Sequence, residues 1–402
     1  MIRTAWFLLV VMLAGTPSGS AQIGRPIDEN PPIRVPAGSC DPAGNIDEVP
    51  FEASSVPLEE WLKEREARQI PMDISVREPE LRMDQQTSVS YIATIQLKNP
   101  KTPLDRKVVF FVGVDDTDGK RLTETSVHAV NIPTGVEGNF DLAVFGCIFF
   151  RPGSYSLWIA AHDESTGRHS VRRQNVRISP IKNDPLPLLD SKNPPARFPN
   201  YTPEDAELDK VVPTPLFLPV SNKRPMAVEI ISLNPYQRQV IGPLSQMTLN
   251  ESSISVTTLD LVTQKVVYDS RAHETFDFTE MLKAAERNRQ DQTIDLSVLV
   301  KRDSTGFLRK YLEQRTKSPD GKARVIFVVS SPIDFERGAD TSSIALDADC
   351  DCRLFYVQVP PRFGSDDLEK ILKSPQSRRM EVNSPLELRR FLASIVRELE
   401  SF

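Results

Sequence analysis

Proline divides this 402-residue chain into two halves that differ in their patterns of apolar residues. Ten of the 33 prolines lie between Ser179 and Lys223. Prolines at this density exclude regular helix and sheet, because each one fixes φ and removes a backbone donor. They also stiffen the chain toward the polyproline II conformation. We therefore expect residues 180–224 to be a linker, partly docked through its apolar residues, between two domains.

Before the linker, apolar residues recur with a period of two. Polar and apolar residues alternate from Ser88 to Leu97, and the segment from Lys107 to Val114 is an almost continuous apolar run. Turn signals such as Asp115 to Gly119 separate six or seven short segments of this kind. Short strands at this spacing are typical of an antiparallel sandwich. The sequence predicts an all-β immunoglobulin-like sandwich over residues 72–179.

After the linker, strand and helix patterns alternate. Met226–Leu233, Ala323–Ser330 and Arg353–Val359 are largely apolar, as expected for strands that are covered on both faces. Helical patterns lie between them at Pro235–Leu249, Phe278–Arg289 and Gly306–Arg315, and Pro385–Leu399 closes the chain with a broad apolar face. This order predicts a doubly wound, Rossmann-like α/β domain over residues 225–402.

The order of the last elements resembles the end of a von Willebrand factor A domain. After an apolar strand come a helix at Leu368–Leu372, the run Arg379–Ser384 and the long final helix. The run Arg151–Ala160, followed by Asp163–Arg168, resembles the β-domain of exported bacterial proteins of the acidobacterial type that carry von Willebrand-related domains. The resemblance implies a protein that binds other proteins or surfaces.

The resemblance also implies where a metal ion would bind. The family holds it with Asp-x-Ser-x-Ser after the first strand, a Thr before a central helix and an Asp after the fourth strand. A hard cation needs carboxylate oxygens, and the matching positions here are nearly all neutral. We therefore expect a metal-less binding face at the carboxyl ends of the strands. Its expected residues are Ser232, Asn234, Tyr236, Thr293, Ser330, Ser331 and Asp334.

A second acidic motif precedes the strand at Arg353. Asp347, Asp349 and Asp351 alternate as in the start of a calcium loop, but a cysteine occupies the position where that loop needs glycine. The alternatives are a weak Ca²⁺ site, a redox Cys-x-Cys pair, or an acidic surface loop with a structural disulfide. The carboxylates would raise the thiol pKa, which favours the last alternative.

The chain has four cysteines and four histidines. Cys40, Cys350 and Cys352 are disulfide candidates, whereas Cys147 lies in an apolar run and is expected to be a buried thiol. His162 and His169 flank one turn and would face each other across a hairpin as exposed side chains. Two ligands without a third make a poor zinc site.

The N-terminus predicts export. Arg3 precedes the apolar run Trp6–Leu13, and Gly19 and Ala21 suit a cleavage site, so residues 1–21 are expected to be a cleavable signal peptide. Residues 22–71 are expected to be an extended arm with a short helix from Pro57 to about Arg68, which would dock through Leu58, Trp61 and Leu62. We expect a secreted or periplasmic protein with no transmembrane segment after signal removal.

The net charge of −6 argues against nucleic-acid binding, and no hydrolase or nucleotide-binding motif occurs. We therefore expect a non-enzymatic protein without a cofactor, which acts in protein binding or cell adhesion through an unidentified partner. The alternatives are an envelope spacer without a ligand site, a weakly metal-dependent adhesion protein, and an enzyme that uses Asp347–Asp351.

Overall fold

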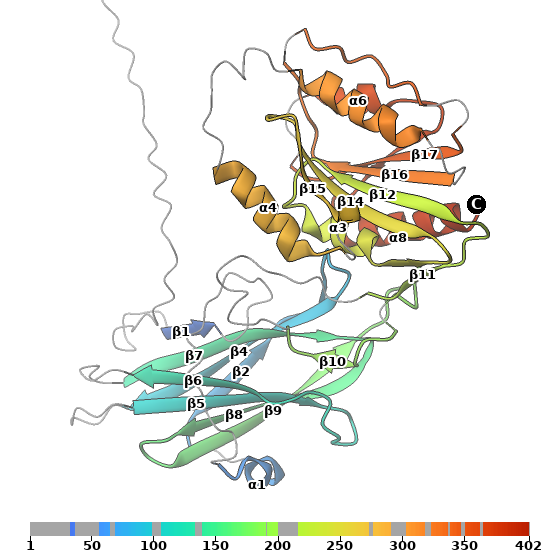
Figure 1. The fold of residues 1–402 in the computed structure, drawn as a ribbon. Helices are drawn as coiled ribbons and strands as arrows, with labels where there is room; N and C mark the ends of the chain where they lie inside the picture. The colour runs from blue at the N-terminus through green and yellow to red at the C-terminus, as the bar shows by residue number, and fades with distance from the viewer. Residues whose placement is uncertain are drawn as a thin grey trace, which may run out of the picture.

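The computed structural model places two β-rich units one after the other along the chain (Figure 1). The residues that it describes are 33–36, 56–64, 69–98, 106–132, 139–189, 191–199, 216–272, 276–290, 303–317, 323–336, 338–346, 350–361 and 365–401. Among them, no helix is both long and apolar enough to cross a membrane.

The N-terminal unit consists of two sheets packed face to face. One has the order β1-β7-β4-β2, with β10 on β7 and β3 on β4, and the other has the order β6-β5-β8-β9. Alternate side chains of both sheets, such as Tyr91, Phe110 and Leu142, form the shared core. The strands are β1 (Ile33–Pro36), β2 (Met72–Val76), β3 (Glu80–Leu81), β4 (Thr87–Lys98), β5 (Arg106–Asp115), β6 (Ser126–Ile132), β7 (Asn139–Phe150), β8 (Gly153–Asp163), β9 (Arg168–Ile178) and β10 (Ala196–Arg197).

A short helix, α1 (Leu58–Lys63), covers the outer face of the second sheet. Its Leu58, Trp61 and Leu62 are buried against that sheet, as the sequence predicts. The sequence predicts that this helix continues to about Arg68. In the structure it ends five residues earlier, at Lys63.

The C-terminal unit is built on a six-stranded sheet with the order β15-β14-β12-β16-β17-β18. Its strands are β12 (Met226–Ser232), β14 (Ser253–Asp260), β15 (Lys265–Asp269), β16 (Ala323–Ser330), β17 (Cys352–Gln358) and β18 (Ser377–Glu381). All neighbouring strands are parallel except β14 and β15. A further pair, β11 (Leu218–Val220) and β13 (Met247–Leu249), forms a small parallel sheet of its own.

Helices lie on both faces of this sheet. Val228 and Ile230 of β12 belong to the core that α3 and α8 cover, whereas Ile231 belongs to the core that α6 and α7 cover. The helices are α3 (Arg238–Ser245), η2 (Ser270–Ala272), α4 (Phe278–Gln290), α6 (Ser304–Thr316), α7 (Asp367–Leu372) and α8 (Pro385–Glu400). Because side chains alternate along a strand, Glu229 points to the α6 face.

The predicted fold class, an immunoglobulin-like sandwich followed by a doubly wound α/β domain, was wrong. Strands make up 42% of the described residues and helices 22%, and the strands belong to several sheets with antiparallel pairing. In the N-terminal unit, β1 is parallel to β7. In the C-terminal unit, β15 is antiparallel, and the described residues between β16 and β17 contain no helix.

The physical reason is that an apolar segment in the sequence indicates a buried strand, but it does not indicate how that strand is connected to the next one. A doubly wound domain needs a helix at each crossover between parallel strands. Here α3 has 8 residues and α7 only 6. The sequence predicts one helix from Pro235 to Leu249. In the structure, helix α3 ends at Ser245, and the residues from Met247 to Leu249 form strand β13.

Candidate functional site: an arginine pocket around Glu229

Glu229 is a charged residue at the middle of an otherwise apolar strand. It lies on β12 with only 5% of its surface exposed. The Tyr311 hydroxyl donates a hydrogen bond to Glu229 Oε1 at 3.1 Å, and the Thr257 hydroxyl approaches the same oxygen at 3.5 Å. Burial raises the pKa of Glu229 above its ordinary value, while the positive charge of Arg271 and the Tyr311 hydrogen bond oppose that rise.

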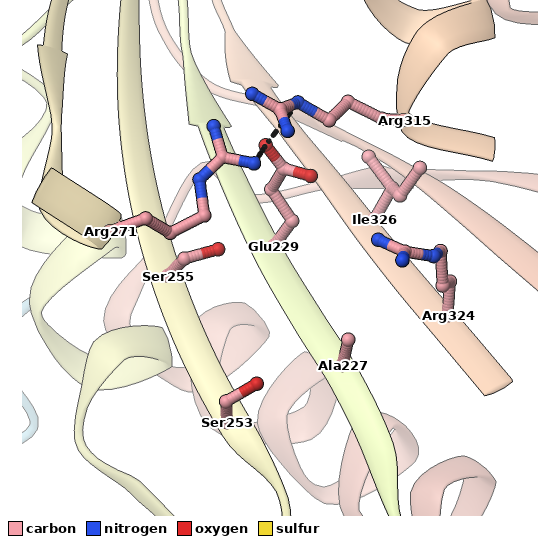
Figure 2. A pocket seen from close by; sticks show the side chains of 8 residues that line it. All are labelled: Ala227, Glu229, Ser253, Ser255, Arg271, Arg315, Arg324 and Ile326. Atoms are coloured by element: carbon pink, nitrogen blue, oxygen red, sulfur yellow. Dashed lines mark ion pairs between the residues drawn. The ribbon is translucent and has the colours of Figure 1, made fainter. Parts of the chain in front are cut away.

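Three arginines from three different elements surround this carboxylate. Arg315, in the last turn of α6, places Nε 3.2 Å from Glu229 Oε1. Arg271 follows β15 in η2, and its Nη1 lies 3.8 Å from the same oxygen. Arg324 comes from β16 and lines the same pocket. Figure 2 shows Arg271 and Arg315 converging on Glu229, with Arg324 on the other side of the carboxylate.

Neighbouring groups hold two of the arginines in position. Asp269 accepts hydrogen bonds from Arg271 Nε and Nη2, at 2.8 and 2.5 Å. Arg315 Nη2 donates to the Tyr311 hydroxyl at 3.1 Å, and its guanidinium lies over the Tyr311 ring at 4.9 Å. The guanidinium groups are therefore oriented before any ligand arrives, which lowers the entropic cost of binding.

The last turn of α6, which carries Arg315, borders the pocket. Its volume is about 280 Å³. Sheet register explains its floor, because Ser253, Ala227 and Arg324 lie in one row across β14, β12 and β16, and Ser255, Glu229 and Ile326 lie in another. The small side chains of Ala227, Ser253 and Ser255 leave room on the sheet beside the arginines (Figure 2).

Counted over the residues that the structure describes, the cluster carries one net positive charge. Its three guanidinium groups, Arg271, Arg315 and Arg324, face two carboxylates, Glu229 and Asp269. Arginine binds planar anions through paired N–H groups, and a partly buried position strengthens that interaction. The arrangement can therefore hold one added anionic group.

The described residues expected at the strand ends already have hydrogen-bond partners, some within their own loop and some in a neighbouring loop. The buried Ser232 hydroxyl donates to Asn234 O, and the buried Ser330 hydroxyl donates to Ser331 O, each at 2.7 Å. The Asn234 side chain accepts from the Tyr236 amide at 3.0 Å. Tyr236 remains 55% exposed.

Two further expected residues of that face are also engaged. Ser331 accepts a hydrogen bond from Gln237 Nε2 at 3.0 Å and donates to Pro360 O at 3.2 Å. Asp334 accepts from the Ser365 hydroxyl at 2.7 Å. Thr293 lies outside the described residues. The polar side chains in the loops after β12 and β16 therefore already bond to other groups of the protein. The arginine pocket is the better candidate site.

The acidic motif gives no metal cluster within the described part of the chain. No group of three or more His, Cys, Asp or Glu side chains that could hold an ion is found there. Asp347 and Asp349 lie outside the described residues, and Asp351 forms an ion pair with Arg224.

The disulfide predictions have mixed outcomes. Cys350 and Cys352 are joined by a disulfide. Cys147 is also disulfide-bonded, so the prediction of a buried thiol was wrong. Its apolar neighbours indicate burial but carry no information about a bonding partner. Cys40 lies outside the described residues.

His162 and His169 pair across the β8–β9 hairpin, as predicted. The prediction that both are exposed was wrong, because His169 is 7% exposed and His162 is half-buried. The Trp61 ring stacks on His169 with 4.3 Å between ring centroids and lies 5.1 Å from His162. The covering residue comes from α1, about 100 residues earlier in the chain, and a local pattern could not reveal it.

Comparison with known proteins adds little to this site. No family model matches the chain, and no curated protein does. The proximal thread matrix protein 1 of the mussel byssus aligns at 12% identity and a TM-score of 0.27, over 45% of this chain and 48% of its own. The ApaA protein from Bordetella pertussis aligns at 11% identity and a TM-score of 0.16, over 29% and 99%. The chain thus spans about half the length of the mussel protein, and scores this low carry no argument about fold or function.

Proposed function

We propose that this chain is an exported, non-enzymatic interaction protein whose C-terminal unit binds an acidic side chain of a partner protein in the arginine pocket. The observation that carries the proposal is the convergence of Arg271, Arg315 and Arg324 on one partly open, net positive depression. Arginine side chains in partly desolvated positions are frequent anchors of protein interfaces.

The size and charge of the pocket favour a side chain over a whole small molecule. At about 280 Å³ it lies below the range of roughly 300–1,000 Å³ typical of small-molecule sites. One carboxylate would neutralise its single net charge. A phosphate dianion would leave an uncompensated negative charge beside Glu229, at a cost in desolvation.

The lining residues favour binding over catalysis. General acid–base and nucleophilic catalysis require a base within hydrogen-bond reach of a nucleophile. The described lining contains no histidine or cysteine, and its polar members are three arginines, two serines and Glu229. Such groups suit the recognition of charge.

Two features support export. The apolar run Trp6–Leu13 with Gly19 and Ala21 fits a secretory signal. Cys350, Cys352 and Cys147 are all disulfide-bonded, and disulfides persist mainly in oxidising compartments.

The test is calorimetric titration of the protein with a hexaglutamate peptide amide, with the matching hexaglutamine peptide as the ligand control. We expect the acidic peptide alone to bind, and R315Q and R324Q to weaken binding about tenfold or more each, as expected for the loss of a charge-assisted hydrogen bond. R287Q removes an exposed arginine of α4 and should leave affinity unchanged. Equal affinity for both peptides, or equal loss in R287Q, would contradict the proposal.

A further inference from the structure

Glu229 occupies the position of an anionic ligand within its own pocket. Both Arg315 Nε and Arg271 Nη1 approach Glu229 Oε1, at 3.2 and 3.8 Å. The Glu229 side chain is only 7% exposed, whereas those of Arg271 and Arg315 are 33% and 26% exposed. The arginines can therefore reach an incoming anion at the opening, but Glu229 cannot leave the sheet.

We propose that Glu229 is a built-in counter-anion, that a carboxylate of the partner protein competes with it for Arg271 and Arg315, and that Glu229 takes up a proton when the partner binds. This inference rests on the proposed function and adds its regulation. It predicts that binding strengthens as the solution becomes more acidic, within the range in which the partner's carboxylates remain ionised.

The groups around Glu229 determine the direction of the effect. Arg271 in η2, Arg315 in α6 and Arg324 in β16 favour the ionised carboxylate, whereas Asp269 in β15 disfavours it. Among the described residues, the uncharged hydroxyls of Tyr311 in α6 and Thr257 in β14 also contact Glu229. A second carboxylate that shares the arginines adds a nearby negative charge, and like charges raise each other's pKa.

The two hydroxyls can also accommodate a protonated Glu229. Hydroxyl oxygens both donate and accept hydrogen bonds. When Glu229 is ionised, Tyr311 donates to Oε1. When Glu229 carries a proton, its own O–H can donate to the Tyr311 oxygen, so the buried carboxyl group remains paired after the arginines turn to the ligand.

The experiment is titration of the full chain with the hexaglutamate peptide amide at pH 5.5, 6.5 and 7.5, in buffers of different ionisation enthalpy. The buffer dependence of the heat counts the protons taken up. For the wild type we expect net proton uptake on binding and affinity several-fold higher at pH 5.5 than at pH 7.5, because the carboxylate of the peptide raises the pKa of the buried Glu229 further.

The variant E229Q keeps the size of the side chain and removes its charge. We expect it to bind at pH 7.5 more tightly than the wild type, to lose the pH dependence and to take up no proton. E313Q, on the same helix as Arg315, should behave as the wild type and serves as the matched control. The proton count on the wild type tests the inference even if E229Q fails to fold.

The outcomes separate this inference from the proposed function. Peptide binding that is independent of pH, or that weakens in E229Q, would overturn the role of Glu229 and leave the arginine pocket standing. Binding by E229Q but not by the wild type at pH 7.5 would support the inference. No binding by either protein at any pH would overturn the proposed function together with it.

Discussion

His128 is an imidazole held in the interior of the N-terminal unit. It lies on β6, on the same face as the core residues Val130 and Ile132, and is 5% exposed. Ser126 Oγ lies 2.8 Å from its Nε2. Desolvation by burial lowers the pKa of His128 to about 4. The folded protein therefore contains neutral His128, and the unfolded chain binds a proton more readily.

This difference predicts a loss of stability in mild acid. Above the unfolded pKa of about 6.5 neither state is protonated, and His128 contributes no pH dependence. As pH falls from 6.5 toward 4, the unfolded state gains the proton first and stability decreases. Between pH 7 and pH 5 we expect a loss of about 2 kcal/mol in the free energy of unfolding from His128 alone.

The measurement is urea unfolding of the wild type and H128L at pH 7 and pH 5. H128L cannot titrate, so its stability should fall by about 2 kcal/mol less than that of the wild type. The other titrating groups are common to both proteins and cancel in this comparison. An equal decrease in the two proteins would mean that His128 is accessible to protons in the folded state.

At the same scale, the candidate site could be predicted only in part. Glu229 and Arg324 each interrupt an apolar strand, and a charge in a buried strand is a signal that needs explanation. Arg271 and Arg315 carry no such signal, because charged residues in a turn and in a helix end are ordinary. The register of the sheet and the position of the C-terminal end of α6 bring these four residues together. Neither feature can be predicted from the local sequence.

At the scale of elements, α1 is a six-residue helix held by one large side chain. Trp61 is 6% exposed and packs on Phe111 as well as on His169. Arg173 Nη2 adds a hydrogen bond to Leu62 O at 2.9 Å. An isolated helix this short is not stable in water, so its structure depends on docking.

We therefore expect W61A to release α1 from the sheet. The expected cost is about 3 kcal/mol of unfolding free energy, as for other buried aromatic residues changed to alanine. Hydrogen exchange should show rapid exchange of the α1 amides, while those of β4 and β7 remain protected. L188A, at a side chain that is 59% exposed, should change neither quantity by much. Continued protection of α1 in W61A would show that other contacts hold it.

Element boundaries were predicted best where apolar residues are continuous. The predicted strand Ala323–Ser330 coincides with β16, and the predicted helix Phe278–Arg289 differs from α4 by one residue. Periodicity reports which side chains are buried. It did not reveal how strands are connected, so the fold class was wrong although many of its strands were found.

At the scale of the whole molecule, the proline-rich linker is part of the packed structure. Leu189 is 1% exposed and joins the core of the C-terminal unit, and Leu186 packs against that core. The sandwich also contacts the C-terminal unit directly, because Gln85 Nε2 donates a hydrogen bond to Pro385 O at the start of α8, at 3.0 Å. In Figure 1 the sandwich and α6 lie on opposite sides of the C-terminal sheet, so these contacts are made on the face away from α6.

One ion pair anchors the linker to α8. Arg389 is 5% exposed, and its Nε and Nη2 donate to the two oxygens of Asp184, each at 2.6 Å. Arg389 Nη2 also donates to Leu186 O at 2.9 Å. Burial alone would raise the pKa of Asp184, but the hydrogen bonds from Arg389 outweigh it and hold that pKa below its ordinary value. The pair therefore stabilises the folded state at neutral pH.

Removal of Arg389 should weaken the coupling between the two units. R389A removes both hydrogen bonds from the guanidinium to Asp184 and leaves that carboxylate only the Leu186 amide at 2.9 Å, so we expect a loss of about 3 kcal/mol in stability. R390A changes the exposed neighbour on the same helix and should have little effect. In scanning calorimetry of the full chain, R389A should separate unfolding into two transitions, since the linker no longer transmits the melting of one unit to the other. A single transition in R389A, shifted no further than in R390A, would show that the buried leucines of the linker couple the units without the ion pair.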